Sequence, residues 1–310
     1  IGLHGKSFIP LMMGFGCNVP AIMASRSIES RSSRIITVLI NPFMSCSARL
    51  PIYVLLVGMF FPDHAALMFL LLYILGVVMA IVTARLLRRF WFKKDETPFV
   101  MELPPYRMPT FKATVRHMWG KGKEYLKKMG GIILVGSIVI WALNYFPLHN
   151  SNVDEAGVEH TSQNVAEVES VNDDSAIDME KDSYLEMIGK GINPVMEPLG
   201  FEWRTTIAAL AGLPAKEIVV STLGVLYTGD EEADDAALNS RLEASGDFDA
   251  ASALAFMVFI LLYCPCIATV TAISRETGSW KYGAFSVIYN TMLAWLAAWL
   301  VYNIAGLFTI

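Results

Sequence analysis

The chain has 310 residues, of which 54% are hydrophobic and 17% are charged, and its formal net charge is −5. A mean hydropathy of +0.46 is high for a water-soluble protein and predicts an all-α fold, a polytopic bundle of membrane helices. Basic residues are confined to short loops, which gives no sign of nucleic-acid binding. All four cysteines fall inside apolar segments, so a secreted disulfide framework is excluded.

Seven segments are long and apolar enough to be candidate membrane spans, since a spanning helix needs about 20 apolar residues. They cover roughly 8–25, 35–61, 64–88, 130–147, 205–227, 250–273 and 281–309. The loop at 89–129 is the most basic, and we therefore expect it in the cytoplasm. Counting spans from there places residues 148–204 outside and the acidic loop 229–248 inside.

This count divides the chain into three parts. Residues 1–147 hold a first repeat and the helices that follow it, and residues 205–310 hold a second repeat and the last helices. Residues 148–204 form an acidic insertion outside the membrane, with a disordered first part at 148–182 and short surface helices from 184 to 199. Because the chain does not begin with Met, we expect it to be part of a longer protein.

The first candidate span is interrupted by Gly-Phe-Gly-Cys-Asn-Val-Pro at residues 14–20. Pro20 has no backbone N–H, so the carbonyl of Gly16 loses its helical partner. At membrane depth such a carbonyl must find another partner or line a polar cavity. With Cys17 and Asn18 beside it, this break is a candidate place for a small cation to lose its water.

The second and fifth spans carry similar interruptions. Residues 41–51 contain Ser45, Cys46 and Arg49 between two prolines, and Arg49 must be paired at membrane depth, with Glu217 as one candidate. In the fifth span Pro214 precedes Lys216 and Glu217, which are adjacent and so point in different directions on a regular helix. Two interrupted segments in corresponding halves indicate a transporter binding site.

The sixth span contains Cys264-Pro265-Cys266, in which the proline kink lets two sulfurs approach one ion. Thiolates suit soft and borderline metals such as Cu(I), Zn(II) and Fe(II). Cys17, Cys264 and Cys266 are therefore the candidate metal ligands. A free cysteine also packs well as a small apolar side chain, and that interpretation is preferred for Cys46.

Together these motifs resemble the ferrous iron transport protein B family along nearly the whole chain and in the same order. They are His-Gly-Lys-Ser-Phe-Ile-Pro at 4–10, the segments 14–21 and 41–51, Gly-Leu-Pro-Ala-Lys-Glu at 212–217, and Cys-Pro-Cys at 264–266. The resemblance implies two Gate repeats in a multi-pass protein of the bacterial inner membrane that imports Fe(II) and is not itself an enzyme. It also implies that Cys17, Cys264 and Cys266 lie on the iron path.

Members of that family normally begin with a cytoplasmic G domain, which uses GTP and Mg and is absent from these residues. The resemblance therefore assigns GTP to no residue here. The partners that it implies are Fe(II), the lipid bilayer, the G domain of a full-length chain and small accessory Feo proteins, with a homo-oligomer left open and no nucleic acid.

Four other functions compete with this interpretation. The chain could transport another divalent metal, or it could carry a nucleoside-type solute through the same repeats. A metal-pumping P-type ATPase also has Cys-Pro-Cys in a membrane helix, but its Asp-Lys-Thr-Gly sequence does not occur here. A scaffold without transport activity leaves the charged residues Arg49, Lys216 and Glu217 at membrane depth unexplained.

Overall fold

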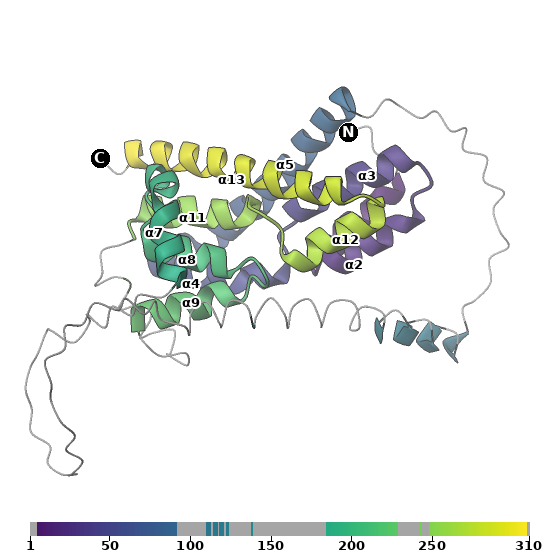
Figure 1. Cartoon of the computed structure of the whole chain (residues 1–310), viewed down its shortest axis with the longest axis horizontal. Coiled ribbons are helices and arrows are strands. Elements are labelled where there is room, and N and C mark those ends of the chain that lie inside the picture. Colours follow the sequence, from purple (N-terminus) through teal and green to yellow (C-terminus); the bar gives the residue numbers. More distant parts are fainter. Residues whose placement is uncertain are drawn as a thin grey trace, which may run out of the picture.

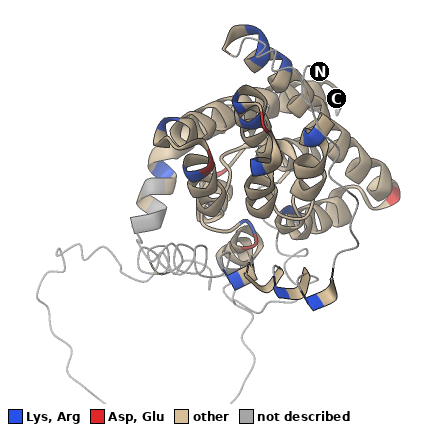
Figure 2. Ribbon diagram, turned by 90° about the vertical axis from the view of Figure 1, so that its right-hand side faces the viewer, with Lys and Arg blue, Asp and Glu red and all other residues tan. Residues whose placement is uncertain are grey.

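The computed structural model describes residues 5–91, 184–228 and 248–308, with isolated positions between 110 and 138 and at 242. Throughout these residues the regular structure is helical (Figure 1), which confirms the predicted all-α membrane bundle with interrupted helices. Seen from one end, most of the helical ribbon carries neither acidic nor basic residues (Figure 2).

Four helical segments in the described part are long and apolar enough to cross a membrane. They are Arg31–Phe60, Pro62–Phe90, Ala250–Thr277 and Trp280–Leu307. These confirm the spans predicted at 35–61, 64–88, 250–273 and 281–309. The predicted span at 130–147 and the acidic segment 148–182 lie outside the described residues.

The segment predicted to span at 8–25 is instead a hairpin of two short helices, α1 (Phe8–Gly14) and α2 (Asn18–Ala24). Each has seven residues and is about 10 Å long, a third of the hydrocarbon core. Cys17 between them is extended, with φ −149° and ψ 130°, so the chain reverses there. Lys6 Nζ lies 2.7 Å from Glu29 Oε1, which shows that the hairpin begins and ends at the same end of the bundle. The short 3-10 turns η1 (Gly5–Ser7) and η2 (Ser25–Ser27) flank it.

The segment predicted to span at 205–227 is a second hairpin, made of α8 (Trp203–Ala211) and α9 (Ile218–Thr228). The guanidinium of Arg204 lies over the ring of Tyr227 at 5.4 Å from its centroid, so the start of α8 and the end of α9 share one end. The loop predicted to lie inside the cell at 229–248 falls almost entirely outside the described residues. A hairpin adds no crossing, so the chain leaves α9 on the side from which it entered α8.

Each hairpin is followed by a span that is broken in its middle. The first span consists of α3 (Arg31–Ile40), η3 (Asn41–Phe43), η4 (Ser47–Arg49) and α4 (Leu50–Phe60). The second consists of α11 (Ala250–Leu262) and α12 (Ile267–Thr277). We call residues 44–47 the first break and residues 263–267 the second break, each including the first residue of the helix that follows. Likewise, residues 15–17 and 212–217 are the first and second hairpin tips.

Two uninterrupted helices, α5 (Ala65–Phe90) and α13 (Trp280–Phe308), support the broken spans; the turn η5 (Pro62–His64) leads into α5. α13 runs beside both α11 and α12 (Figure 1). α5 passes so close to the first broken span that a Cβ added at Gly76 would lie 2.7 Å from the carbonyl oxygen of Phe43. The expected short helices before the second hairpin are confirmed as α7 (Tyr184–Met196) and η6 (Glu197–Leu199).

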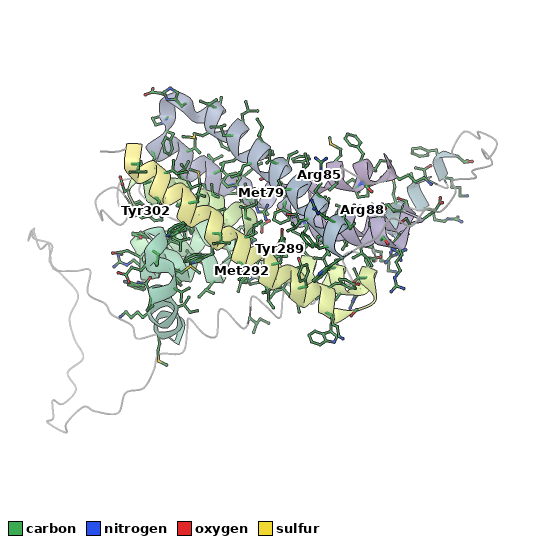
Figure 3. The ribbon with its side chains drawn as sticks, turned by 90° about the horizontal axis from the view of Figure 1, so that it is seen from above. Met79, Arg85, Arg88, Tyr289, Met292 and Tyr302 are labelled. Atoms are coloured by element: carbon green, nitrogen blue, oxygen red, sulfur yellow. The ribbon has the colours of Figure 1, made fainter. Side chains whose placement is uncertain are left out.

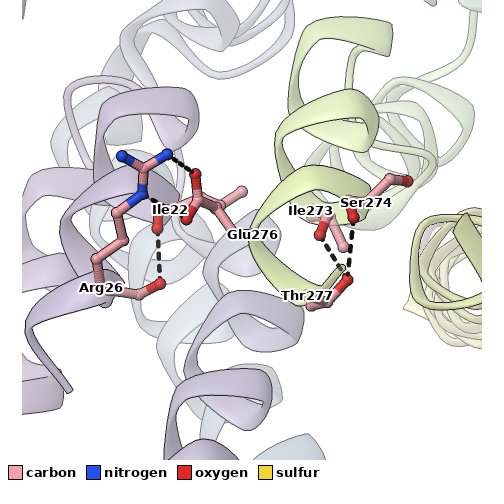
Figure 4. A network of polar contacts seen from close by, with 7 residues as sticks. Ile22, Arg26, Ile273, Ser274, Glu276 and Thr277 are labelled. Atoms are coloured by element: carbon pink, nitrogen blue, oxygen red, sulfur yellow. Dashed lines mark hydrogen bonds and ion pairs between the residues drawn. The ribbon is translucent and has the colours of Figure 1, made fainter. Parts of the chain in front are cut away.

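The two halves enter the bundle from opposite ends. Arg26, just after α2, forms a two-point ion pair with Glu276 near the end of α12, with Nε 2.6 Å from Oε2 (Figure 4). Arg26 lies eight residues after Asn18, and Glu276 lies nine residues after Ile267, so α2 and α12 pack side by side in parallel. Their first turns, next to the first tip and the second break, therefore lie at the same depth.

The hairpin structure of residues 5–27 predicts which positions can be labelled from which side. In a variant with its four cysteines replaced by serine, Lys6→Cys and Ser27→Cys should both react with a membrane-impermeant maleimide from the same side. Asp63→Cys, between the first two spans, should react from the other side and serves as the control. Labelling of positions 6 and 27 from opposite sides would show that this segment crosses the membrane.

Candidate functional site

Each hairpin tip is hydrogen bonded to the break of the span that follows it. The backbone N–H and the hydroxyl of Ser47 both donate to the carbonyl of Gly16, at 3.2 and 3.0 Å. In the second half the N–H of Ile267 donates to the carbonyl of Leu213 at 3.0 Å. The carbonyl predicted to be freed by Pro20 thus finds its donor in the first break, and the two repeats use the same arrangement.

Polar side chains beside the first break are only partly satisfied. Asn41 Nδ2 donates to the backbone and side-chain oxygens of Asn18, at 3.3 and 3.2 Å. The other amide oxygen, Asn41 Oδ1, is buried without a hydrogen-bond partner, as are Ser45 Oγ and the hydroxyl of Tyr53. A Cβ at Gly14 would lie 2.9 Å from Asn41 Oδ1, so glycine is needed there. Buried oxygens without partners are costly and mark a place where a polar species can be bound.

Arg49 is buried, with only 1% of its surface exposed, and it stabilises the first break. Its two terminal nitrogens donate to the carbonyls of Pro42 and Met44, both at 3.2 Å. The expected partner Glu217 is exposed and is not paired with it, so that prediction was wrong. The physical reason is local, because the break leaves carbonyls without helical donors and the fixed fork of the guanidinium supplies them.

Lys216, from the second tip, reaches the second break. Its ammonium donates to the carbonyl of Cys264 at 2.8 Å and lies 3.0 Å from the ring centroid of Tyr263, whose hydroxyl donates to Ala209 O at 3.1 Å. Lys216 is only 2% exposed, whereas Glu217 is exposed, so the two do point in different directions. No ion pair joins Lys216 to a carboxylate of the described residues. A backbone oxygen and an aromatic face therefore hold this cation.

Three of the four free cysteines occupy the same local position, since Cys17, Cys46 and Cys266 are the non-helical residues directly before α2, η4 and α12. The positive end of a helix N-terminus favours a negative ligand or a thiolate. The sulfur of Cys266 lies 3.0 Å from Thr269 Oγ1, and Cys264 Sγ lies 3.3 Å from the carbonyl oxygen of Pro265.

The cysteines do not form one ready-made cage. Among the described residues, no three side chains of His, Cys, Asp or Glu are grouped so that they could hold a metal ion. Lys216 contacts one of these cysteines, Cys264, through its backbone carbonyl. The assignment of Cys17, Cys264 and Cys266 as metal ligands stays a prediction.

Gly16, Ser47 and Glu217 are exposed although they belong to the tips and breaks. Each tip therefore has an exposed residue at its surface. Pro214 and Pro265 are buried beside them. The sequence reasoning missed Asn41, Tyr53 and Tyr263 as site residues, although Asn41 and Tyr263 directly precede the proline and Cys-Pro-Cys signals that it used.

Two hairpins and two broken spans in inverted arrangement define a multi-pass membrane protein built from two repeats. The family model Gate, described as "Nucleoside recognition", matches residues 1–60 and 126–280. A second model, described as "Ferrous iron transport protein B C terminus", matches residues 69–121. The chain belongs to the ferrous iron transport protein B family and corresponds to its multi-pass membrane portion.

Curated relatives match almost the whole chain. A protein of Porphyromonas gingivalis, named Fe(2+) transport protein A/Fe(2+) transporter FeoB fusion protein, is 50% identical over 99% of this chain and 39% of its own length. Fe(2+) transporter FeoB of Staphylococcus aureus is 42% identical over 99% of this chain, and that of Methanocaldococcus jannaschii is 40% identical over 98%. The chain spans about two fifths of the length of these relatives. No solved structure matches it.

Proposed function

We propose that this chain forms the path by which Fe(II) crosses the bacterial inner (plasma) membrane into the cytoplasm, and that it carries out transport rather than catalysis. The observation that carries the proposal is the joining of each hairpin tip to a broken span, with buried side-chain oxygens of Asn41, Ser45 and Tyr53 left without partners beside the first break. The relatives named as Fe(2+) transporters support Fe(II) as the substrate.

The ion would pass along a series of weak contacts. Cys17, Cys264 and Cys266 would offer sulfur, and the freed carbonyls with Ser45 and Asn41 would offer oxygen. The lack of a three-ligand group among the described side chains agrees with weak binding at several points, which suits release. Affinity for thiolate cannot select Fe(II), because such sites generally hold Zn(II) and Cu(II) more tightly. Selectivity would then depend on the ions available and on gating.

Lys216 would act as a tethered cation that closes this path. Its ammonium occupies the Cys264 carbonyl, which is an oxygen that a dehydrated ion would use. A divalent ion about 5 Å from that ammonium would be repelled by several kcal/mol at an effective dielectric constant of about 20. Entry of the ion would therefore require Lys216 to move away from Cys264, together with the second tip that carries it.

In the full-length protein we propose that the G domain, using GTP and Mg, drives this movement. The tips are suited to move because each is a short segment between two seven- to eleven-residue helices. A small accessory protein is a further proposed partner, since one relative is named as a fusion of transport protein A with the transporter.

The cysteine path is tested by uptake of radiolabelled Fe(II) in cells without their own importer. The Cys264→Ser, Cys266→Ser double variant of the full-length protein should lose at least about tenfold in uptake rate, because oxygen replaces sulfur at the second break. Thr271→Val removes a hydroxyl one turn further along α12, and this control should transport normally.

Expression and thermal unfolding of both variants are measured so that a folding defect is recognised. Normal uptake by a folded double variant would show that these cysteines serve in packing. Uptake of labelled uridine without uptake of metal would instead favour a nucleoside-type carrier.

The role of Lys216 is tested by metal binding. Lys216→Met in the full-length protein should bind Co(II), a redox-stable substitute for Fe(II), at least about tenfold more tightly, because the competing charge is gone. Lys216→Arg keeps the charge and should bind no more tightly than the wild type. Isothermal titration calorimetry in detergent measures both, and unchanged or weaker binding by a folded Lys216→Met variant would contradict a closing role.

A further inference from the structure

An apolar groove runs along the outside of the bundle between α1, α3 and α5, and its inner end reaches Phe15 of the first tip and Met44 of the first break. Its volume is about 270 Å³. Phe8 and Met12, on one wall, are 65% and 52% exposed, so the groove opens toward the surroundings of the bundle. The wall residues are all apolar: Phe8, Leu11, Met12, Phe15, Ile40, Met44, Val77, Ala80, Ile81 and Ala84.

The groove has a closed inner end and a basic outer end. At the inner end Phe15 stacks on Tyr73, with ring centroids 5.9 Å apart. On α5 the stripe formed by Val77, Ile81 and Ala84 continues one turn later at Arg88, because residues four apart lie on one face of a helix. Arg85 follows Ile81 by one turn and lies at the edge of the same stripe.

Arg88 is held in place but not neutralised. One terminal nitrogen, Nη1, donates to the hydroxyl of Ser33 on α3 at 3.3 Å. Its Nε is buried and has no hydrogen-bond partner. Arg85 is exposed, and no ion pair joins either arginine to an acidic side chain of the described residues. Figure 3 shows both arginines on α5 beside the N-terminal helices. The outer end of the groove thus offers donors to an anion.

This outer end is the basic end of the bundle, which also carries Arg26 and Lys6 and is expected to face the cytoplasm. An apolar groove that is open to lipid is filled by an acyl chain. Guanidinium groups match the oxygens of a phosphate in geometry as well as in charge. Anionic lipids are attracted to basic residues at the membrane surface. Chain and headgroup contacts therefore combine in one ligand.

We propose that this groove binds one acyl chain of an anionic phospholipid, whose phosphate is held by Arg85 and Arg88. α1 is the outer arm of the first hairpin, and its other end leads into the tip at Gly16. A lipid in the groove would pack α1 against α5 and so fix the position of that tip. The site is independent of which solute the protein transports.

The test is native mass spectrometry of the purified full-length protein with phosphatidylglycerol and phosphatidylcholine of identical acyl chains. The wild type should retain phosphatidylglycerol at least about fivefold better. The Arg85→Gln, Arg88→Gln double variant should lose this preference, and the Arg85→Lys, Arg88→Lys variant should keep part of it. The control is the Arg31→Gln variant, which should keep the full preference for phosphatidylglycerol. Arg31 is an exposed basic residue at the same end of the bundle, and it lies about 160° around α3 from Ser33.

A second variant tests the groove itself. Val77→Trp fills the groove and should lower the retention of both lipids. The midpoint temperature of thermal unfolding in lipid-free detergent should change by no more than a few degrees. The proposal is overturned if the double Gln variant keeps its preference, or if Arg31→Gln loses as much as that variant does. It is also overturned if Val77→Trp, folded, retains lipid as the wild type does.

Discussion

The structure depends on one constraint, which is that every backbone carbonyl freed inside the membrane needs a donor from within the protein. Proline and glycine free such carbonyls in both halves of the chain. Ser47 and Ile267 meet them with backbone N–H groups, Arg49 with its guanidinium and Lys216 with its ammonium. The tips and the breaks are therefore joined in one hydrogen-bonded arrangement. Each interruption of a helix depends on donors or acceptors that the other interruption supplies.

The same constraint accounts for the chemistry proposed for the site. A cation can take the place of a backbone N–H at a carbonyl oxygen, and a metal ion is one such cation. In this conformation Lys216 and Arg49 take that position with protein atoms. Transport would require these tethered cations to yield their oxygens to Fe(II) for a short time, with the cysteines before α2 and α12 as the sulfur ligands nearby.

Much of this could be predicted from the sequence, because proline and glycine act locally. The positions of the interruptions, the four long spans and the divergence of Lys216 from Glu217 were all predicted. The two hairpins were not, because an apolar stretch of about 18 residues has the same composition whether it spans or turns back at Gly16. The partners of Arg49 and Lys216 could not be predicted either, since they are carbonyls whose position depends on how the breaks pack. Sequence pattern shows which residues carry sulfur and charge, but not which of them meet.

In the proposed path, Fe(II) contacts cysteine sulfur at the second break. X-ray absorption at the iron edge of the full-length protein, loaded with Fe(II) without oxygen, tests it most directly. We expect sulfur in the first coordination shell of the wild type and its loss in the Cys264→Ser, Cys266→Ser variant. A first shell of oxygen and nitrogen alone in the loaded wild type would contradict it and would leave the freed carbonyls as the ligands.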